Sequence, residues 1–176
     1  DTGLTNATTY YYVIRAFDAS QESGNSVQAS ATPIDNLVPV APTGLTAADV
    51  PADNGGSLAL SWTVSTATDV TAQRIYRGVV SGGPYVLIAT IPNNIVTGYT
   101  DTGLTNGTTY YYVIRACDGT QESADSGQTL AAPIDNVAPV APTGPTAADV
   151  LGDNGGAISL AWTPSTSTDV TAQRVY

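Results

Sequence analysis

The chain repeats its own sequence at intervals of 100 residues, and this limits its fold more than any other feature. The segment Asp1–Asn6 returns as Asp101–Asn106, and Thr68–Arg74 returns as Thr168–Arg174. Most of the paired positions in between are identical. A fixed period of this kind is typical of proteins built as an array of similar units. We therefore expect copies of one folding unit rather than one large domain.

The repeat predicts three parts. Residues 37–136 are one complete repeat, of a size that can bury a two-sheet core. Residues 1–36 correspond to the C-terminal part of such a repeat, and residues 137–176 correspond to the N-terminal part of the next. The stretch Arg77–Thr100 has no second copy. The chain is thus expected to be a window on a longer tandem protein.

The charge of the chain is strongly one-sided. It holds 15 acidic residues against five arginines, without lysine or histidine, for a net charge of −10. Such a chain cannot neutralise a row of phosphates, so nucleic acid is excluded as a partner, and so is an anionic membrane surface. No apolar run approaches the roughly 18 residues of a membrane span, so no membrane insertion is predicted in this segment.

The residues needed for catalysis are missing. Without histidine, no Ser–His or Cys–His pair can activate a nucleophile. Cys117 is the only cysteine, so neither an intrachain disulfide nor a cysteine metal site can form. Its counterpart is Phe17, which indicates a packing position. The sequence predicts a protein with no enzymatic activity, no catalytic residue and no cofactor.

Segments of high β-propensity alternate with turn signals about every ten residues, which predicts an all-β sandwich. In Ser57–Thr63, the residues Leu58, Leu60 and Trp62 alternate with small ones and should face the core. The proline-rich joins Pro33–Pro42 and Pro133–Pro142 are expected to be stiff connectors. The expected strands of the complete repeat are Thr43–Val50, Ser57–Thr63, Thr71–Arg77, Tyr85–Ile91, Thr97–Asp101, Thr108–Cys117 and Ser126–Ala132.

These residues resemble bacterial fibronectin type III domains over the whole chain. The resemblance is carried by Ala41–Leu45, Leu58–Trp62, Arg74–Arg77 and Tyr99–Ala116. It implies an immunoglobulin-like sandwich of seven strands in two antiparallel sheets, arranged as a tandem array.

The resemblance also implies roles for particular residues. The positions that it places in the core or in a tyrosine corner are Leu4, Tyr10, Trp62, Leu104, Tyr110, Tyr112 and Trp162. In a tyrosine corner, the phenol forms a hydrogen bond with nearby backbone at the end of the sandwich. One departure is that Gln73 and Gln173 stand where the family usually has an aromatic residue. This indicates either a polar amide near the core or a locally loose strand.

Three groups of residues are candidate sites. Asp49, Asp53 and Asp135 could begin a Ca²⁺ site, although the segment Asp53–Gly56 is also explained as a turn. The sequons at Asn6 and Asn106 are possible glycosylation sites, with the turn as the alternative. By strand alternation, the outer face of one sheet carries a set that is either an interface or an ordinary surface ladder: Arg74, Tyr76, Tyr111, Val113 and Arg115.

Two functions fit these observations. The first is a structural repeat of an extracellular or cell-surface protein that acts as a spacer, stalk or filament subunit. Its partners would be adjacent repeats or further copies of the chain, through end-to-end packing. The alternative is an accessory spacer or carbohydrate-binding module of a secreted polysaccharide-degrading enzyme. Both Trp62 and Trp162 are expected to face inward, so the sequence offers little support for sugar binding.

Overall fold

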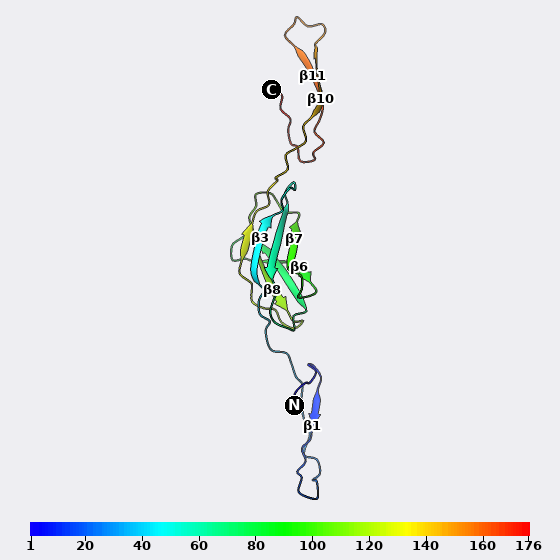
Figure 1. The fold of residues 1–176 in the computed structure, drawn as a ribbon, viewed down its shortest axis with the longest axis vertical. Coiled ribbons are helices and arrows are strands. Elements are labelled where there is room, and N and C mark those ends of the chain that lie inside the picture. The colour runs from blue at the N-terminus through cyan, green and yellow to red at the C-terminus, as the bar shows by residue number, and fades with distance from the viewer.

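A computed structural model describes all residues, 1–176. The chain forms a rod, with a two-sheet unit in the middle and a two-stranded hairpin at each end (Figure 1). The prediction of an all-β fold is confirmed. The strands are β1 (Tyr10–Tyr12), β2 (Ala29–Ala31), β3 (Thr43–Asp49), β4 (Ser57–Thr63), β5 (Ala72–Gly78), β6 (Val86–Ile91), β7 (Gly98–Thr102), β8 (Tyr110–Cys117), β9 (Thr129–Ala131), β10 (Thr143–Asp149) and β11 (Ile158–Thr163).

The middle unit is a sandwich of two antiparallel sheets. One has the strand order β3-β4-β7, and the other has the order β6-β5-β8-β9. Side chains of both sheets form one core because alternate residues of each strand point between the sheets. The buried cluster consists of Leu58, Leu60, Trp62, Ile75, Leu104, Tyr110, Tyr112 and Ile114.

The last strand of the middle unit is shorter than the sequence predicts. Pairing was expected from Ser126, but β9 begins at Thr129. Two serine hydroxyls upstream take the place of strand carbonyls. The Ser126 Oγ accepts a hydrogen bond from the amide of Ile114 at 3.0 Å, and the Ser123 Oγ accepts one from Ala116 at 3.0 Å. Such side-chain bonds compete with the regular ladder, so this segment follows β8 without becoming a strand.

The two terminal hairpins expose residues that the resemblance places in a core. Trp162 is 39% exposed, whereas its counterpart Trp62 is 5% exposed. Leu4 and Tyr10 are only half-buried. Residues 1–36 and 137–176 therefore do not bury these three residues in a core of their own. The reason is that each hairpin is one pair of strands with no second sheet to cover it.

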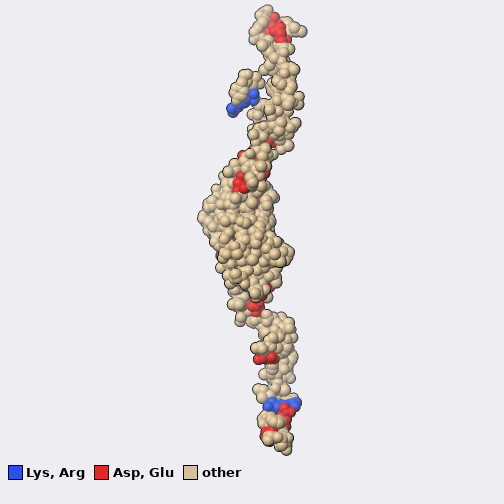
Figure 2. Space-filling view, viewed as in Figure 1, with Lys and Arg blue, Asp and Glu red and all other residues tan.

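Acidic side chains are scattered along the rod on the face shown in Figure 2, and basic side chains gather only at the two hairpins. None of the elements is a helix long and apolar enough to cross a membrane.

Candidate functional site: the junctions beside the middle unit

The C-terminal end of the middle unit is built from two loops fastened together. In the turn after β3, Gly55 and Gly56 have φ angles of 80° and 78°, which glycine adopts without strain. The Asn106 side chain, from the loop before β8, accepts a hydrogen bond from the Gly56 amide at 2.7 Å and donates one to the Asn54 carbonyl at 3.2 Å. A Cβ on Gly55 would collide with the Asn106 side chain. The loop pair thus forms a fixed platform.

Asp49, the last residue of β3, holds the connector Pro133–Pro142 where it leaves the middle unit. One carboxylate oxygen accepts the backbone N–H of Ile134 at 2.8 Å, and the other accepts the Asn136 side-chain amide at 3.0 Å. Pro133, just before them, is buried, and its carbonyl accepts the Gly107 amide at 2.9 Å. The first residues of the connector are therefore held on several sides.

Asp53 completes this contact through its backbone. Its N–H donates to the Asn136 side-chain oxygen at 3.1 Å, and its carbonyl accepts the Asn136 N–H at 3.3 Å. We call Asp49, Asp53, Ile134 and Asn136 the connector clamp. Because an asparagine side chain can both donate and accept a hydrogen bond, Asn136 binds Asp49 and Asp53 at the same time.

The opposite end of the middle unit contacts the preceding connector. The Gln121 side chain donates a hydrogen bond to the Asp35 carbonyl at 3.4 Å. Residues 37–40 and the loop 66–69 face each other across a shallow groove. Pro39 and Pro42 of this connector are buried. The middle unit therefore contacts the chain segments that enter and leave it, one at each end.

The three aspartates of the calcium hypothesis accept hydrogen bonds from different groups instead of converging on one point. Asp49 binds the connector as described, the Asp53 carboxylate accepts the Gly55 amide at 2.9 Å as a turn residue, and Asp135 accepts the Val137 amide at 3.1 Å. No group of three or more acidic, cysteine or histidine side chains is placed so that it could hold a metal ion. The turn interpretation of Asp53 fits this geometry.

The predicted interface residues lie on the outer face of the four-stranded sheet, where they form an ion-pair network. Arg74 and Arg115 stand directly opposite each other on β5 and β8. Glu122 separates the two like charges: it pairs with Arg74 and, at 3.0 Å, with Arg115. Asp125 adds a contact of 2.6 Å to Arg115. The sequence reasoning missed both acids.

Tyr76 joins this network from the same sheet face. Its hydroxyl donates to Glu122 at 3.0 Å, and the Arg115 guanidinium lies 4.4 Å from the centre of its ring. Burial raises the pKa of Glu122, but hydrogen bonds from Arg115, Arg74 and Tyr76 outweigh it and hold that pKa below its usual value. These contacts match the surface-ladder alternative, and one atom of the network, the Arg74 Nε, is buried without a hydrogen-bond partner.

Val113 does not belong to an exposed face. It was expected beside Tyr111 and Arg115, but it is only 2% exposed. Val113 stands opposite Tyr76 in register, so the larger side chains of Tyr76, Tyr111 and Arg115 surround it on the sheet. Tyr111 itself is half-buried. The prediction that Val113 is an exposed interface residue is therefore wrong.

The unusual glutamine of the sequence lies in the core. Gln73 is fully buried, and its Oε1 accepts the indole N–H of Trp62 at 2.6 Å. Its Nε2 donates to the carbonyls of Asn93 and Val96, at 3.1 and 3.0 Å. The polar-amide alternative is thus the one observed, because the amide satisfies a buried tryptophan and the loop before β7.

A second buried polar group was not expected from the sequence. Asp101 is 4% exposed and pairs with Arg77 at 2.9 Å, while the Tyr112 hydroxyl donates to it at 2.8 Å. Burial and this hydrogen bond raise the pKa of Tyr112. The ion pair joins the two sheets, since Arg77 lies on β5 and Asp101 lies on β7.

Tyr110 makes the contact that the resemblance implies. Its hydroxyl accepts the Thr105 backbone N–H at 3.1 Å, and Tyr10 does the same with Thr5 at 3.0 Å. Leu104 is buried beside it in the core. Cys117 is buried, and burial raises the pKa of its thiol, in agreement with a packing position.

Two known proteins are similar to this chain in sequence. No family model matches the chain. Exoglucanase B of Cellulomonas fimi is 29% identical over 191 residues, covering 100% of this chain and 16% of that protein. Amylopullulanase of Thermoanaerobacter thermohydrosulfuricus is 40% identical over 79 residues, covering 44% of this chain and 5% of that protein. The chain thus spans a small fraction of each relative's length.

Solved structures give the fold. An Fn3-like protein from Clostridium thermocellum is 35% identical, with 53% of this chain and 92% of that chain covered and a TM-score of 0.46. The FN1–FN3 domains of chicken CNTN1 are 15% identical, with 75% and 45% covered and a TM-score of 0.51. The resemblance to fibronectin type III domains is confirmed, and so is the sandwich fold of the middle unit.

Proposed function

From this fibronectin type III fold, we propose that the chain is a non-catalytic spacer in a secreted enzyme that degrades polysaccharides. The observation that carries the proposal is the connector clamp. Four hydrogen bonds fix Ile134 and Asn136 to the end of the middle unit. A spacer needs a defined direction where it leaves each unit, and a clamped, proline-rich connector supplies it.

The repeat extends this argument to the other junction. Asn36 and Asp35 in the first connector correspond to Asn136 and Asp135 in the second, and Gln21 corresponds to Gln121. The clamp occurs at the C-terminal end of the middle unit, and the Gln121 contact occurs at its N-terminal end. Between two complete repeats, both contacts would act on the same connector from opposite sides. Such a junction would resist bending.

The relatives support the setting of the proposal. Their names describe glucan-degrading enzymes, and the chain matches only a small part of each. A polymeric glucan is too large to enter a cell, so a segment of such an enzyme would work outside it. The net charge of −10 would keep neighbouring units apart in solution.

A binding assay separates a spacer from a carbohydrate-binding module. The chain is mixed with insoluble cellulose and, separately, with granular starch, and the solids are removed by centrifugation. A spacer stays in the supernatant in both cases, at the level of an unrelated acidic protein. Retention on either solid that a soluble oligosaccharide of the same sugar releases would contradict the spacer proposal.

A further inference from the structure

The turn after β3 carries a side-chain amide that the fold leaves free. The Asn54 side chain is exposed and makes no hydrogen bond within the chain. Gly55, which follows it, has no side chain that would hinder a reaction between the two residues. The Gly55 N–H donates to the Asp53 carboxylate at 2.9 Å. The turn therefore places a free amide, a backbone nitrogen and a carboxylate side by side.

A second Asn-Gly pair in the middle unit is held by hydrogen bonds on every side. The Asn106 Oδ1 accepts the Gly56 amide at 2.7 Å, and its Nδ2 donates to the Asn54 carbonyl at 3.2 Å. The Gly107 N–H donates to the Pro133 carbonyl at 2.9 Å, so its proton faces a carbonyl and not a carboxylate. The two pairs are alike in sequence, but only the first has a free amide and a carboxylate beside it.

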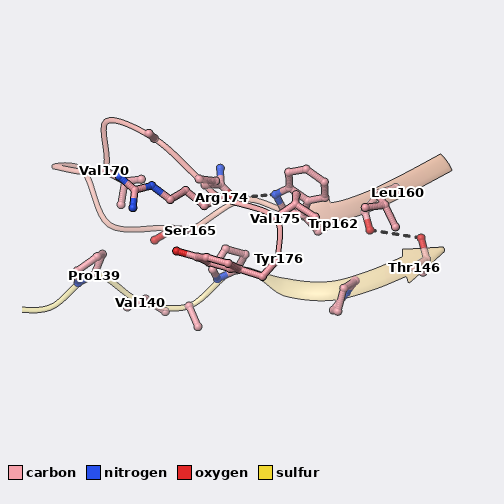
Figure 3. Close-up of a pocket in the computed structure, with 16 residues that line it drawn as sticks. Pro139, Val140, Thr146, Leu160, Trp162, Ser165, Val170, Arg174, Val175 and Tyr176 are labelled. Atoms are coloured by element: carbon pink, nitrogen blue, oxygen red, sulfur yellow. Dashed lines mark hydrogen bonds between the residues drawn. The ribbon is translucent and has the colours of Figure 1, made fainter. Parts of the chain in front are cut away.

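The same turn recurs at the tip of the hairpin β10-β11. The Gly155 N–H donates to the Asp153 carboxylate at 2.9 Å, and the Asn154 side chain is exposed. Figure 3 shows the strands below this turn, with Thr146 on β10 and Trp162 on β11 beside an open groove of about 530 Å³. No residue of the turn lines that groove. Asn154 is therefore a second free amide with the same neighbours as Asn54.

We infer that Asn54 is a site of spontaneous deamidation, with the Asp53 carboxylate as the base. The Gly55 nitrogen forms a bond to the Asn54 Cγ, and the bond from Cγ to Nδ2 breaks. The proton of the Gly55 N–H passes to the carboxylate and then leaves with the amide nitrogen as ammonia. Water opens the resulting succinimide by adding OH to one ring carbonyl and H to the ring nitrogen, which leaves aspartate or isoaspartate. At 2.9 Å, the carboxylate lies within the reach that a general base needs.

Isoaspartate at position 54 would loosen the connector clamp. It adds a methylene to the backbone between Asp53, which binds Asn136 through its N–H and its carbonyl, and Gly56, which binds Asn106. Aspartate, the other product, keeps the backbone path and adds only a charge. The inference goes beyond the proposed spacer function and does not depend on it, since the reaction is measured on the chain itself.

Peptide mapping of the aged full chain tests the inference. One sample is kept folded in mildly alkaline buffer, and another is kept unfolded in guanidinium chloride. Trypsin places Asn54, Asn106 and Asn154 in separate peptides, 16–74, 78–115 and 116–174, and mass spectrometry follows the change of each amide to an acid. In the folded chain, Asn54 and Asn154 should react at least about tenfold faster than Asn106, whose hydrogen bonds must open first. In the unfolded chain, the three rates should be similar. An Asn54 that reacts no faster than Asn106 in the folded chain would overturn the inference.

Two variants test the base and the consequence. Asp53→Ser should slow the reaction at Asn54 by at least about tenfold and leave that at Asn154 unchanged; an unchanged rate at Asn54 would refute the role of the carboxylate. Asn54→Gln should stop the reaction and keep hydrogen exchange at the Asn136 amide slow in aged protein. Aged wild-type protein should exchange this amide faster as its isoaspartate content rises, and equal exchange in the two aged samples would refute the loosening of the clamp. Fresh samples of both variants should unfold at the wild-type Tm.

Discussion

The buried amide of Gln73 offers the sharpest test of the core. Gln73→Met keeps an unbranched side chain of similar length but removes the acceptor for the Trp62 indole N–H. The indole is then buried without a partner, because Trp62 is only 5% exposed. The carbonyls of Asn93 and Val96 also lose a donor, but both lie nearer the surface.

The magnitude follows from the unpaired donor. A buried donor left without an acceptor costs about 1–3 kcal/mol, so we expect a loss of about 2 kcal/mol in the free energy of unfolding. For a unit of about 100 residues, that loss corresponds to a fall in Tm of about 8–16 °C. Urea unfolding followed by circular dichroism measures the first quantity, and calorimetry measures the second.

The chain contains a matched control for this experiment. Gln173 makes the same bond to Trp162 in the C-terminal hairpin, where the tryptophan is open to water. Gln173→Met should therefore leave the unfolding of the middle unit unchanged. A loss below about 0.5 kcal/mol for Gln73→Met would refute the argument, since it would mean that the indole needs no internal acceptor.

Three further changes test the fold and the network. Tyr110→Phe should cost about 1 kcal/mol because the Thr105 amide loses its acceptor, whereas Tyr111→Phe should cost less than half of that; equal losses in urea unfolding would count against the tyrosine corner. The lowered pKa of Glu122 gives stability that is present above about pH 4 and is lost as the pH falls through the folded-state pKa, so Glu122→Gln should flatten the acid side of a Tm-against-pH curve; an unchanged curve would contradict this. Gly55→Ala should lower the free energy of unfolding of the middle unit by more than the roughly 1–2 kcal/mol that a left-handed backbone costs alanine, because the new Cβ also meets the Asn106 side chain. Gly155→Ala, where nothing lies within 4 Å of the new Cβ, should leave the unfolding of that unit unchanged. Equal effects of the two changes on the middle unit would mean that the Asn106 side chain moves aside without cost.

Local sequence patterns predicted the strands well where alternation and turn residues agree. Strand β4 has the expected bounds because it begins directly after a glycine turn, and its residues Leu58, Leu60 and Trp62 then alternate with small ones. Strand β9 is shorter than expected because Ser123 and Ser126 bond to β8 through their side chains. Residue type does not reveal which of its two hydrogen-bonding groups a serine will use.

The site depends on pairings that are distant in sequence. Asn136 meets Asp49 and Asp53 across more than 80 positions, and local patterning does not encode that distance. The signal available was that Asn36 and Asn136, like Gln21 and Gln121, are the same in both copies. Val113 was misplaced for a related reason, since alternation gives the face of a strand but not what covers it.

The central claim is that the connector is fixed to the unit before it. Backbone ¹⁵N relaxation of the chain measures this directly at the amides of Ile134 and Asn136. We expect order parameters of about 0.85, as in the strands, falling below about 0.6 in the Asp49→Ala variant. Asp149→Ala, at the counterpart in the C-terminal hairpin, should change neither amide. Order parameters already near 0.6 with Asp49 intact, or unchanged without it, would contradict the claim.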